Sequence, residues 1–147
     1  MLISHGAIIL VIDGAKMSIF RNCGRDLAAD LELIEQNAKH ASSTAELGTD
    51  EPGRSFGSKR RARSAYQSTN YHQGEEDAFA TAATEKLNSS AQQSHLDFIV
   101  IAAPHVLGVM RQHYSSGLRK QIVAEIAKDY AGRPVADVVE LLSYHER

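Results

Sequence analysis

The sequence predicts an α/β domain in which antiparallel strands come first and strands alternate with helices later. Two segments carry this prediction. Residues 8–22 predict a strand, a tight Asp-Gly turn and a second strand, and residues 97–111 predict a buried strand that runs into a helix. The continuous, β-branched run Ile8–Ile12 is typical of a strand that is buried on both faces.

The first third of the chain predicts three antiparallel strands in a meander. Asp13-Gly14 is a strong hairpin signal, and a type I′ turn with positive φ at both residues is expected there. The segment Ala15–Asn22 then alternates mainly between apolar and polar residues. After a second turn at Gly24, Leu31–Asn37 supplies the third strand.

Regular patterning disappears between Lys39 and Gly74, where small, polar and charged residues dominate. A loop of this length in a compact domain is expected to be functional or disordered. Its charges are segregated, with acidic residues first and cations afterwards. The acids are Glu46, Asp50 and Glu51, and the cations are Arg54, Lys59, Arg60, Arg61 and Arg63.

Helical signals follow this loop. The acidic run Glu75–Asp77 marks a helix start, because carboxylates favour the positive end of the helix dipole, and the helix is expected to reach about Ser89. Its buried face would hold Phe79, Ala83 and Leu87. Asp97–Ala103 predicts a short buried strand, and Pro104 suits the first turn of the next helix.

The segment Leu118–Tyr130 is ambiguous. Apolar or aromatic residues recur every four positions, which favours a helix, whereas Gln121–Ala127 equally fits a strand with Ile122, Ala124 and Ile126 facing inward. We predict the strand, because the preceding strand–helix unit is expected to be followed by one. A final amphipathic helix is predicted from the apolar positions Val135, Val138, Val139 and Leu142.

The expected order is β-β-β-(long loop)-α-β-α-β-α over one domain, residues 1–147. Three antiparallel strands followed by βα units make a mixed sheet between helical layers, which is the ribonuclease-H-like arrangement. Four residues are expected in the core on adjacent central strands: Ile9, Val11, Ile99 and Ile101.

The composition of the chain bears on its partners and its location. The chain has 43% hydrophobic residues and a net charge of −2, so its overall charge favours neither nucleic acid nor a membrane surface. The run Ala7–Ile12 is too short to span a bilayer, and no secretory signal is expected. The single cysteine, Cys23, lies in a predicted turn, and a lone exposed thiol fits a cytoplasmic protein.

Catalytic motifs are weak. The order of elements invites a two-metal nuclease site with Asp13 at the end of the first strand, but such a site needs several converging carboxylates. Asp13 is more simply the first residue of the Asp-Gly turn. The seven histidines follow no zinc pattern, no Gly-x-Ser-x-Gly elbow occurs, and no phosphate loop is found. No metal or other cofactor is therefore predicted.

The basic segment Arg54–Tyr66 is the local feature with the clearest functional content. Its cations could contact a phosphate backbone, and Phe56 and Tyr66 could stack on bases. The alternative is a solvated loop whose cations pair with the neighbouring acids. The candidate RNA-binding residues are Arg54, Lys59, Arg60, Arg61, Arg63 and Tyr66.

Five segments in order carry a family resemblance: Ile9–Lys16, Gly53–Phe56, Asp97–Pro104, Leu107–Arg111 and Glu125–Asp129. Together they resemble the bacterial host attachment protein family, whose members carry the label "required for attachment to host cells". Five residues in these segments are expected to act as structural motifs: Asp13, Gly14, Pro104, Gly108 and Arg111.

That family is similar to the central domain of archaeal and eukaryotic peptide-chain release factors and of Pelota. The release-factor loop carries a Gly-Gly-Gln motif that promotes peptidyl-tRNA hydrolysis. This chain has no such motif, since Gln67 and Gln73 lack the preceding glycine pair. The resemblance therefore implies a basic loop suited to ribosomal RNA, without hydrolysis.

These observations predict a non-catalytic, cytoplasmic protein that contacts the ribosome or structured RNA in a translation-related role. Two alternatives stay open. One is a metal-dependent nucleic-acid hydrolase that uses Asp13. The other is a protein-interaction module with an indirect role in host attachment. No membrane insertion is expected, and the sequence leaves the oligomeric state undetermined.

Overall fold

The computed structural model describes residues 2–25, 29–38 and 57–145, and it places the side chains of these residues except for 57–73. A five-stranded sheet with the order β3-β2-β1-β4-β5 forms its centre. The strands are β1 (Ile8–Ile12), β2 (Lys16–Asn22), β3 (Leu31–Ala38), β4 (Phe98–Ala102) and β5 (Ile122–Ala127). β1, β2 and β3 pair antiparallel, whereas β1, β4 and β5 pair parallel. This mixed topology confirms the meander and the ribonuclease-H-like arrangement.

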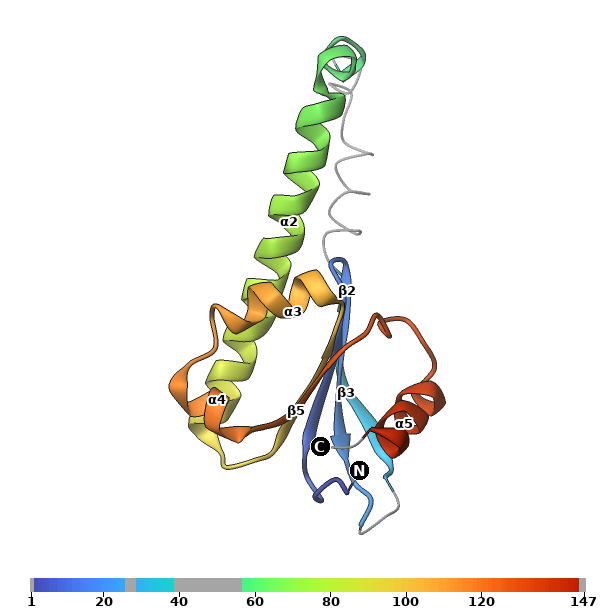
Figure 1. Ribbon diagram of the computed structural model, residues 1–147, viewed down its shortest axis with the longest axis vertical. Coiled ribbons are helices and arrows are strands. Elements are labelled where there is room, and N and C mark those ends of the chain that lie inside the picture. The colour runs from blue at the N-terminus through green and yellow to red at the C-terminus, as the bar shows by residue number, and fades with distance from the viewer. Residues whose placement is uncertain (1, 26–28, 39–56, 146–147) are drawn as a thin grey trace.

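Helices cover both faces of the sheet (Figure 1). α2 (Gly57–Gln93), α3 (Pro104–Arg111) and α4 (Ser116–Gln121) lie on one face, and α5 (Val135–Tyr144) lies on the other. Alternate strand residues supply two separate cores, one under each helical layer. The result is three layers, as the sequence predicts.

The central strands supply the core that α5 covers. Ile9 pairs with Ile99, and Val11 pairs with Ile101, across the parallel β1–β4 ladder. All four side chains are at most 1% exposed. They pack with Val138 and Leu142 of α5, among other residues. The prediction of these four core residues is confirmed.

The connection between β1 and β2 differs from the expected type I′ turn. Only Gly6 and Gly132 among the described glycines have positive φ, so Gly14 does not adopt the left-handed conformation. Instead, one carboxylate oxygen of Asp13 accepts hydrogen bonds from the backbone N–H groups of Ala15 and Lys16, at 2.7 and 2.8 Å. A side-chain cap of this kind fixes the loop without positive φ.

The sequence predicts that this helix begins at Glu75, but in the structure α2 begins much earlier, at Gly57. The prediction of a loop to Gly74 is therefore wrong for residues 57–74, and residues 39–56 lie outside the described residues. The N-terminal half of α2 contains Lys, Arg, Ala and Gln residues, which favour helices. This half of the helix projects beyond the sheet (Figure 1). Because it has no sheet to cover, it needs no apolar stripe, and hydrophobic periodicity could not reveal it. Phe79, Ala83 and Leu87 face the core as expected.

The ambiguous segment contains both predicted structures in succession. α4 ends at Gln121, and β5 begins at Ile122, so the predicted strand is confirmed and the helical spacing reflects α4. One detail is wrong: Ile122 packs in the core under α2, whereas Ala124 and Ile126 pack under α5. A register shift between Phe98 and Ile99 in the β4–β5 pairing accounts for the change of face.

A buried asparagine ties the N-terminal segment to the end of β2. Asn22 is 1% exposed. Its amide nitrogen donates to the carbonyl oxygens of Ile3 and Ser4 at 3.0 and 3.1 Å. Its amide oxygen accepts from the backbone N–H groups of Gly24 and Asp30, both at 3.0 Å. All the hydrogen-bonding groups of the side chain are thereby used.

Candidate nucleic-acid interface

The feature that dominates the outline of the molecule is the projecting half of α2 (Figure 1). The first buried side chain described in this helix is Ala80. An α-helix rises 1.5 Å per residue, so the helix from Gly57 to Ala80 is roughly 35 Å long. The predicted basic residues Lys59, Arg60, Arg61 and Arg63 therefore lie on a helix at a distance from the folded core, and not on an irregular loop.

The structure places most of the candidate RNA-binding residues on one helical stretch. Lys59, Arg60, Arg61, Arg63 and Tyr66 all belong to the projecting half of α2. By the 3.6-residue period, positions 59, 63 and 66 fall on one side of the helix. The sixth candidate, Arg54, lies outside the described residues.

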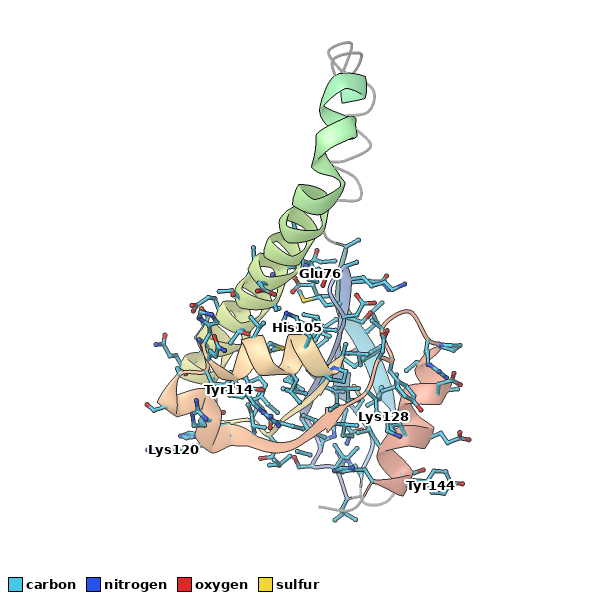
Figure 2. All side chains as sticks on the ribbon, turned by 45° about the horizontal axis from the view of Figure 1, so that its top comes forward. Glu76, His105, Tyr114, Lys120, Lys128 and Tyr144 are labelled. Carbon is cyan, nitrogen blue, oxygen red and sulfur yellow. The ribbon has the colours of Figure 1, made fainter. Side chains whose placement is uncertain are left out.

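Asp13 and Gly14 lie where β1 ends, beside α2. The carboxylate of Asp13 caps its own loop, which confirms its role as a turn residue. A Cβ atom added to Gly14 would lie 2.7 Å from the carboxyl carbon of Glu76, so the glycine allows this side chain of α2 to approach the loop. Glu76 is labelled in Figure 2, near the end of the sheet from which α2 projects.

Pro104 and Gly108, two predicted structural residues, both lie in α3. Pro104 occupies the first turn of α3, as predicted. The neighbouring His105 contacts Asp77 of α2, with 2.9 Å between its Nε2 atom and a carboxylate oxygen. Gly108 is exposed, and an added Cβ would meet nothing within 4 Å, so space around the helix does not require a glycine there.

Arg111 belongs to a polar cluster between α3 and β5. Its Nε and Nη2 atoms both donate to one oxygen of Glu125, at 3.0 and 2.8 Å. The hydroxyl of Tyr114 donates to the other oxygen at 2.7 Å. Burial raises the pKa of Glu125, but the hydrogen bonds from Arg111 and Tyr114 outweigh burial, and the pKa lies below its usual value. Glu125 is therefore ionised at neutral pH.

Arg119 of α4 completes this cluster. Its guanidinium lies 5.6 Å from the centre of the Tyr114 ring, and its Nη2 atom donates to the carbonyl oxygen of Arg111 at 3.1 Å. Burial raises the pKa of Tyr114, and its hydrogen bond to Glu125 raises it further. Sequence reasoning selected Arg111 but missed Tyr114, Arg119 and Glu125, because their proximity arises only when α3, α4 and β5 assemble.

An apolar groove of about 500 Å³ lies between α2 and the strands β2 and β3. The residues that line it include Met17, Ala78, Phe79 and Lys86. Lys86 also forms an ion pair with Glu35 of β3. The alternative role as a protein-interaction module would need an apolar surface of this kind.

Three observations bear on the remaining sequence predictions. Within the described residues, no group of three or more His, Cys, Asp or Glu side chains could hold a metal ion. Cys23 is a free, exposed thiol, as expected. Among the described helices, none is long and apolar enough to cross a membrane.

Two individual proteins show limited similarity to the chain. "Uncharacterized protein RP470" of Rickettsia prowazekii (strain Madrid E) is 43% identical over 56 residues, which are 38% of this chain and 37% of that protein. The ethanolamine utilization protein EutJ from Carboxydothermus hydrogenoformans covers 86% of this chain with 14% identity and a TM-score of 0.39, and the match covers 46% of EutJ. The chain thus spans less than half of either protein, and a TM-score this low supports no conclusion about function.

Family membership rests on a much longer match. The profile described as "Bacterial archaeo-eukaryotic release factor family 12" matches residues 6–142. This range includes every described strand and most of α5. It confirms the release-factor-like part of the predicted resemblance, while the label of host attachment stays a prediction. The chain belongs to the bacterial archaeo-eukaryotic release factor family 12.

Proposed function

We propose that this protein contacts ribosomal or other structured RNA in the cytoplasm through the projecting half of α2, without catalysing peptide release. The observation that carries the proposal is that the part of the basic segment from Gly57 to Tyr66 belongs to a helix that extends beyond the sheet (Figure 1). Membership of a release-factor-like family supports a partner from translation. A role in host attachment would then be an indirect consequence.

The charge of this half of α2 favours an anionic partner. From Gly57 to Gly74 the helix contains four Lys or Arg residues and no Asp or Glu. Cations at a helix N-terminus oppose the helix dipole and do not help the helix to form. Their concentration there is therefore better explained by binding than by stability. Phosphate groups are the ligand class that such a cationic helix attracts, through release of condensed counterions.

The sequence of the helix argues against release activity. The residues nearest in type to the release-factor motif are Gln67 and Gln73, and neither follows a glycine pair. We expect the purified protein to bind ribosomes that carry peptidyl-tRNA and to liberate no peptide from them. Liberation of peptide above the buffer control would contradict the proposal.

Cosedimentation with ribosomes at two salt concentrations tests RNA contact. The test variant replaces Lys59, Arg60, Arg61 and Arg63 by Gln, which removes charge but keeps high helix propensity. If these cations bind phosphates, affinity falls, and the log–log salt slope decreases by about 0.7–0.9 for each phosphate group that is no longer neutralised. The melting temperature should stay nearly unchanged, because the substituted positions lie far from the core.

A matched control removes four exposed cations elsewhere: Arg21, Arg25, Lys128 and Arg133, each replaced by Gln. This variant has the same net charge as the test variant, so general loss of positive charge is separated from loss of the α2 surface. We expect it to retain the wild-type salt slope. If ribosomes bind the wild type and the α2 variant equally, or bind neither, the proposal is wrong.

A further inference from the structure

A second cationic surface lies at the other end of α2. We call it the α3–α4 patch, and it consists of Arg111, Tyr114, Arg119 and Lys120. Figure 2 shows Tyr114 and Lys120 at the end of the molecule where α3 and α4 meet, away from the projecting half of α2. Arg111, Arg119 and Lys120 are all exposed, and Tyr114 is half-buried.

The patch presents more positive than negative charge to solvent. Glu125 is the carboxylate that contacts it, and its side chain is 23% exposed, against 54% for Arg111. The acid therefore lies under the arginine and fixes its position. Arg119 and Lys120 add two cations with which no described acid forms a salt bridge.

The arginine side chains are held in place before any ligand arrives. Arg119 stacks over Tyr114, and its contact with the Arg111 carbonyl uses one of the five N–H donors of a guanidinium. The donors that remain on this exposed side chain can meet phosphate oxygens in a forked geometry. Fixing these side chains in advance lowers the entropy cost of binding.

The distance between the two surfaces follows from α2 itself. Asn88 of α2 accepts a hydrogen bond from the backbone N–H of Ser115 at 2.9 Å and donates one to the carbonyl oxygen of His113 at 3.0 Å. The start of α4 is thereby fixed at the level of Asn88. With a rise of 1.5 Å per residue, Arg61 lies roughly 40 Å away along the helix axis.

We propose that the α3–α4 patch is a second binding surface for the phosphate backbone of the same RNA, so that one structured RNA bridges both ends of α2. This inference rests on the proposed function, because the first binding surface is the projecting half of α2. An RNA that is long enough to reach both surfaces binds the second one as an intramolecular event, and its overall affinity exceeds that of either surface alone.

Length dependence of RNA binding tests the bridge. The probes are an RNA duplex of about 24 base pairs, longer than the roughly 16 that one double-stranded RNA-binding domain spans, and a hairpin of about 6 base pairs. The wild type should bind the long duplex at least about 10-fold more tightly than the hairpin. The double variant Arg119→Gln/Lys120→Gln should lose most of this difference. It keeps the hydrogen bonds of Arg111 and Tyr114 with Glu125, so folding should be preserved, and a melting curve verifies this.

The control variant Arg21→Gln/Arg25→Gln removes the same charge from β2 and the residues that follow it, and it should keep the length dependence. Equal affinity of the wild type for both probes, or an unchanged affinity of Arg119→Gln/Lys120→Gln for the long duplex, would overturn the bridge. The proposed function is judged separately, because ribosome binding that depends on Lys59–Arg63 would stand in either case. If the wild type bound neither ribosomes nor the duplex, both proposals would be wrong.

Discussion

Arg111, at the end of α3, donates two hydrogen bonds to a single carboxylate oxygen of Glu125 in the middle of β5. β5 lies at an edge of the sheet, so this pair fastens an edge strand to α3. Tyr114 joins the same carboxylate through its other oxygen. The cluster therefore links stability at this edge to the ionisation of two groups.

Glu125→Gln should reduce the dependence of stability on acid pH. The pKa of Glu125 is lowered in the folded state, so its ionised form stabilises the fold above the unfolded pKa of about 4.3. This contribution disappears as the pH falls through the folded pKa. The variant should be less stable by about 1 kcal/mol at pH 7, since the partner arginine is largely exposed. The difference should shrink towards pH 3.

Urea unfolding at pH 7, 5, 4 and 3 measures this effect. Glu140→Gln on the exposed side of α5 is the matched control, and it should follow the wild-type curve. Parallel curves for the wild type and Glu125→Gln across this range would contradict the assignment.

Tyr114→Phe should flatten the loss of stability in alkali. Burial and the hydrogen bond to Glu125 raise the pKa of Tyr114 in the folded state. A raised pKa means that the neutral phenol stabilises the fold below the unfolded pKa of about 10, and that this stability is lost as the pH rises further. The variant loses one hydrogen bond, which should lower the free energy of unfolding by about 0.5–1.5 kcal/mol at pH 7. Position 114 then carries no phenol that could ionise at higher pH.

Unfolding monitored from pH 8 to pH 11 checks this prediction. Tyr144 is 79% exposed, so Tyr144→Phe serves as the control and should behave as the wild type does. If the free energy of unfolding of Tyr114→Phe fell as steeply above pH 10 as that of the wild type, Tyr114 would contribute nothing to the loss of stability in alkali.

Asn22→Ala should destabilise the fold by at least about 2 kcal/mol. The substitution leaves two backbone N–H groups and two carbonyl oxygens near β2 without their side-chain partner, and each buried unsatisfied group costs about 1–3 kcal/mol. Denaturant unfolding measures the loss. Asn37→Ala on exposed β3 is the control, and a comparable loss in that variant would contradict a special role for Asn22.

Ile101→Ala should cost about 2–5 kcal/mol, because Ile101 is fully buried in β4 and the truncation leaves a cavity. Ile34→Ala, on the edge strand β3 where the side chain is 44% exposed, removes the same atoms and should cost much less. Thermal and urea unfolding of the two variants provide the comparison. Equal losses would place the main core elsewhere.

The sequence by itself determined the fold class, because strand and helix periodicity depend on local residue order. Continuous β-branched runs located β1 and β4, and the spacing of apolar residues located α5 and the core half of α2. It also placed Asp13 in the β1–β2 connection, since Asp-Gly favours a turn in any context.

The tertiary structure alone decided the features that depend on residues far apart in the chain. α2 extends back to Gly57, and because its first half projects beyond the sheet (Figure 1), hydrophobic periodicity does not reveal that half. Ile122 faces the α2 side because a register shift in the β4–β5 pairing moves it there. Arg111, Tyr114, Arg119 and Glu125 form one cluster only because α3, α4 and β5 meet, and no spacing along the chain encodes that meeting.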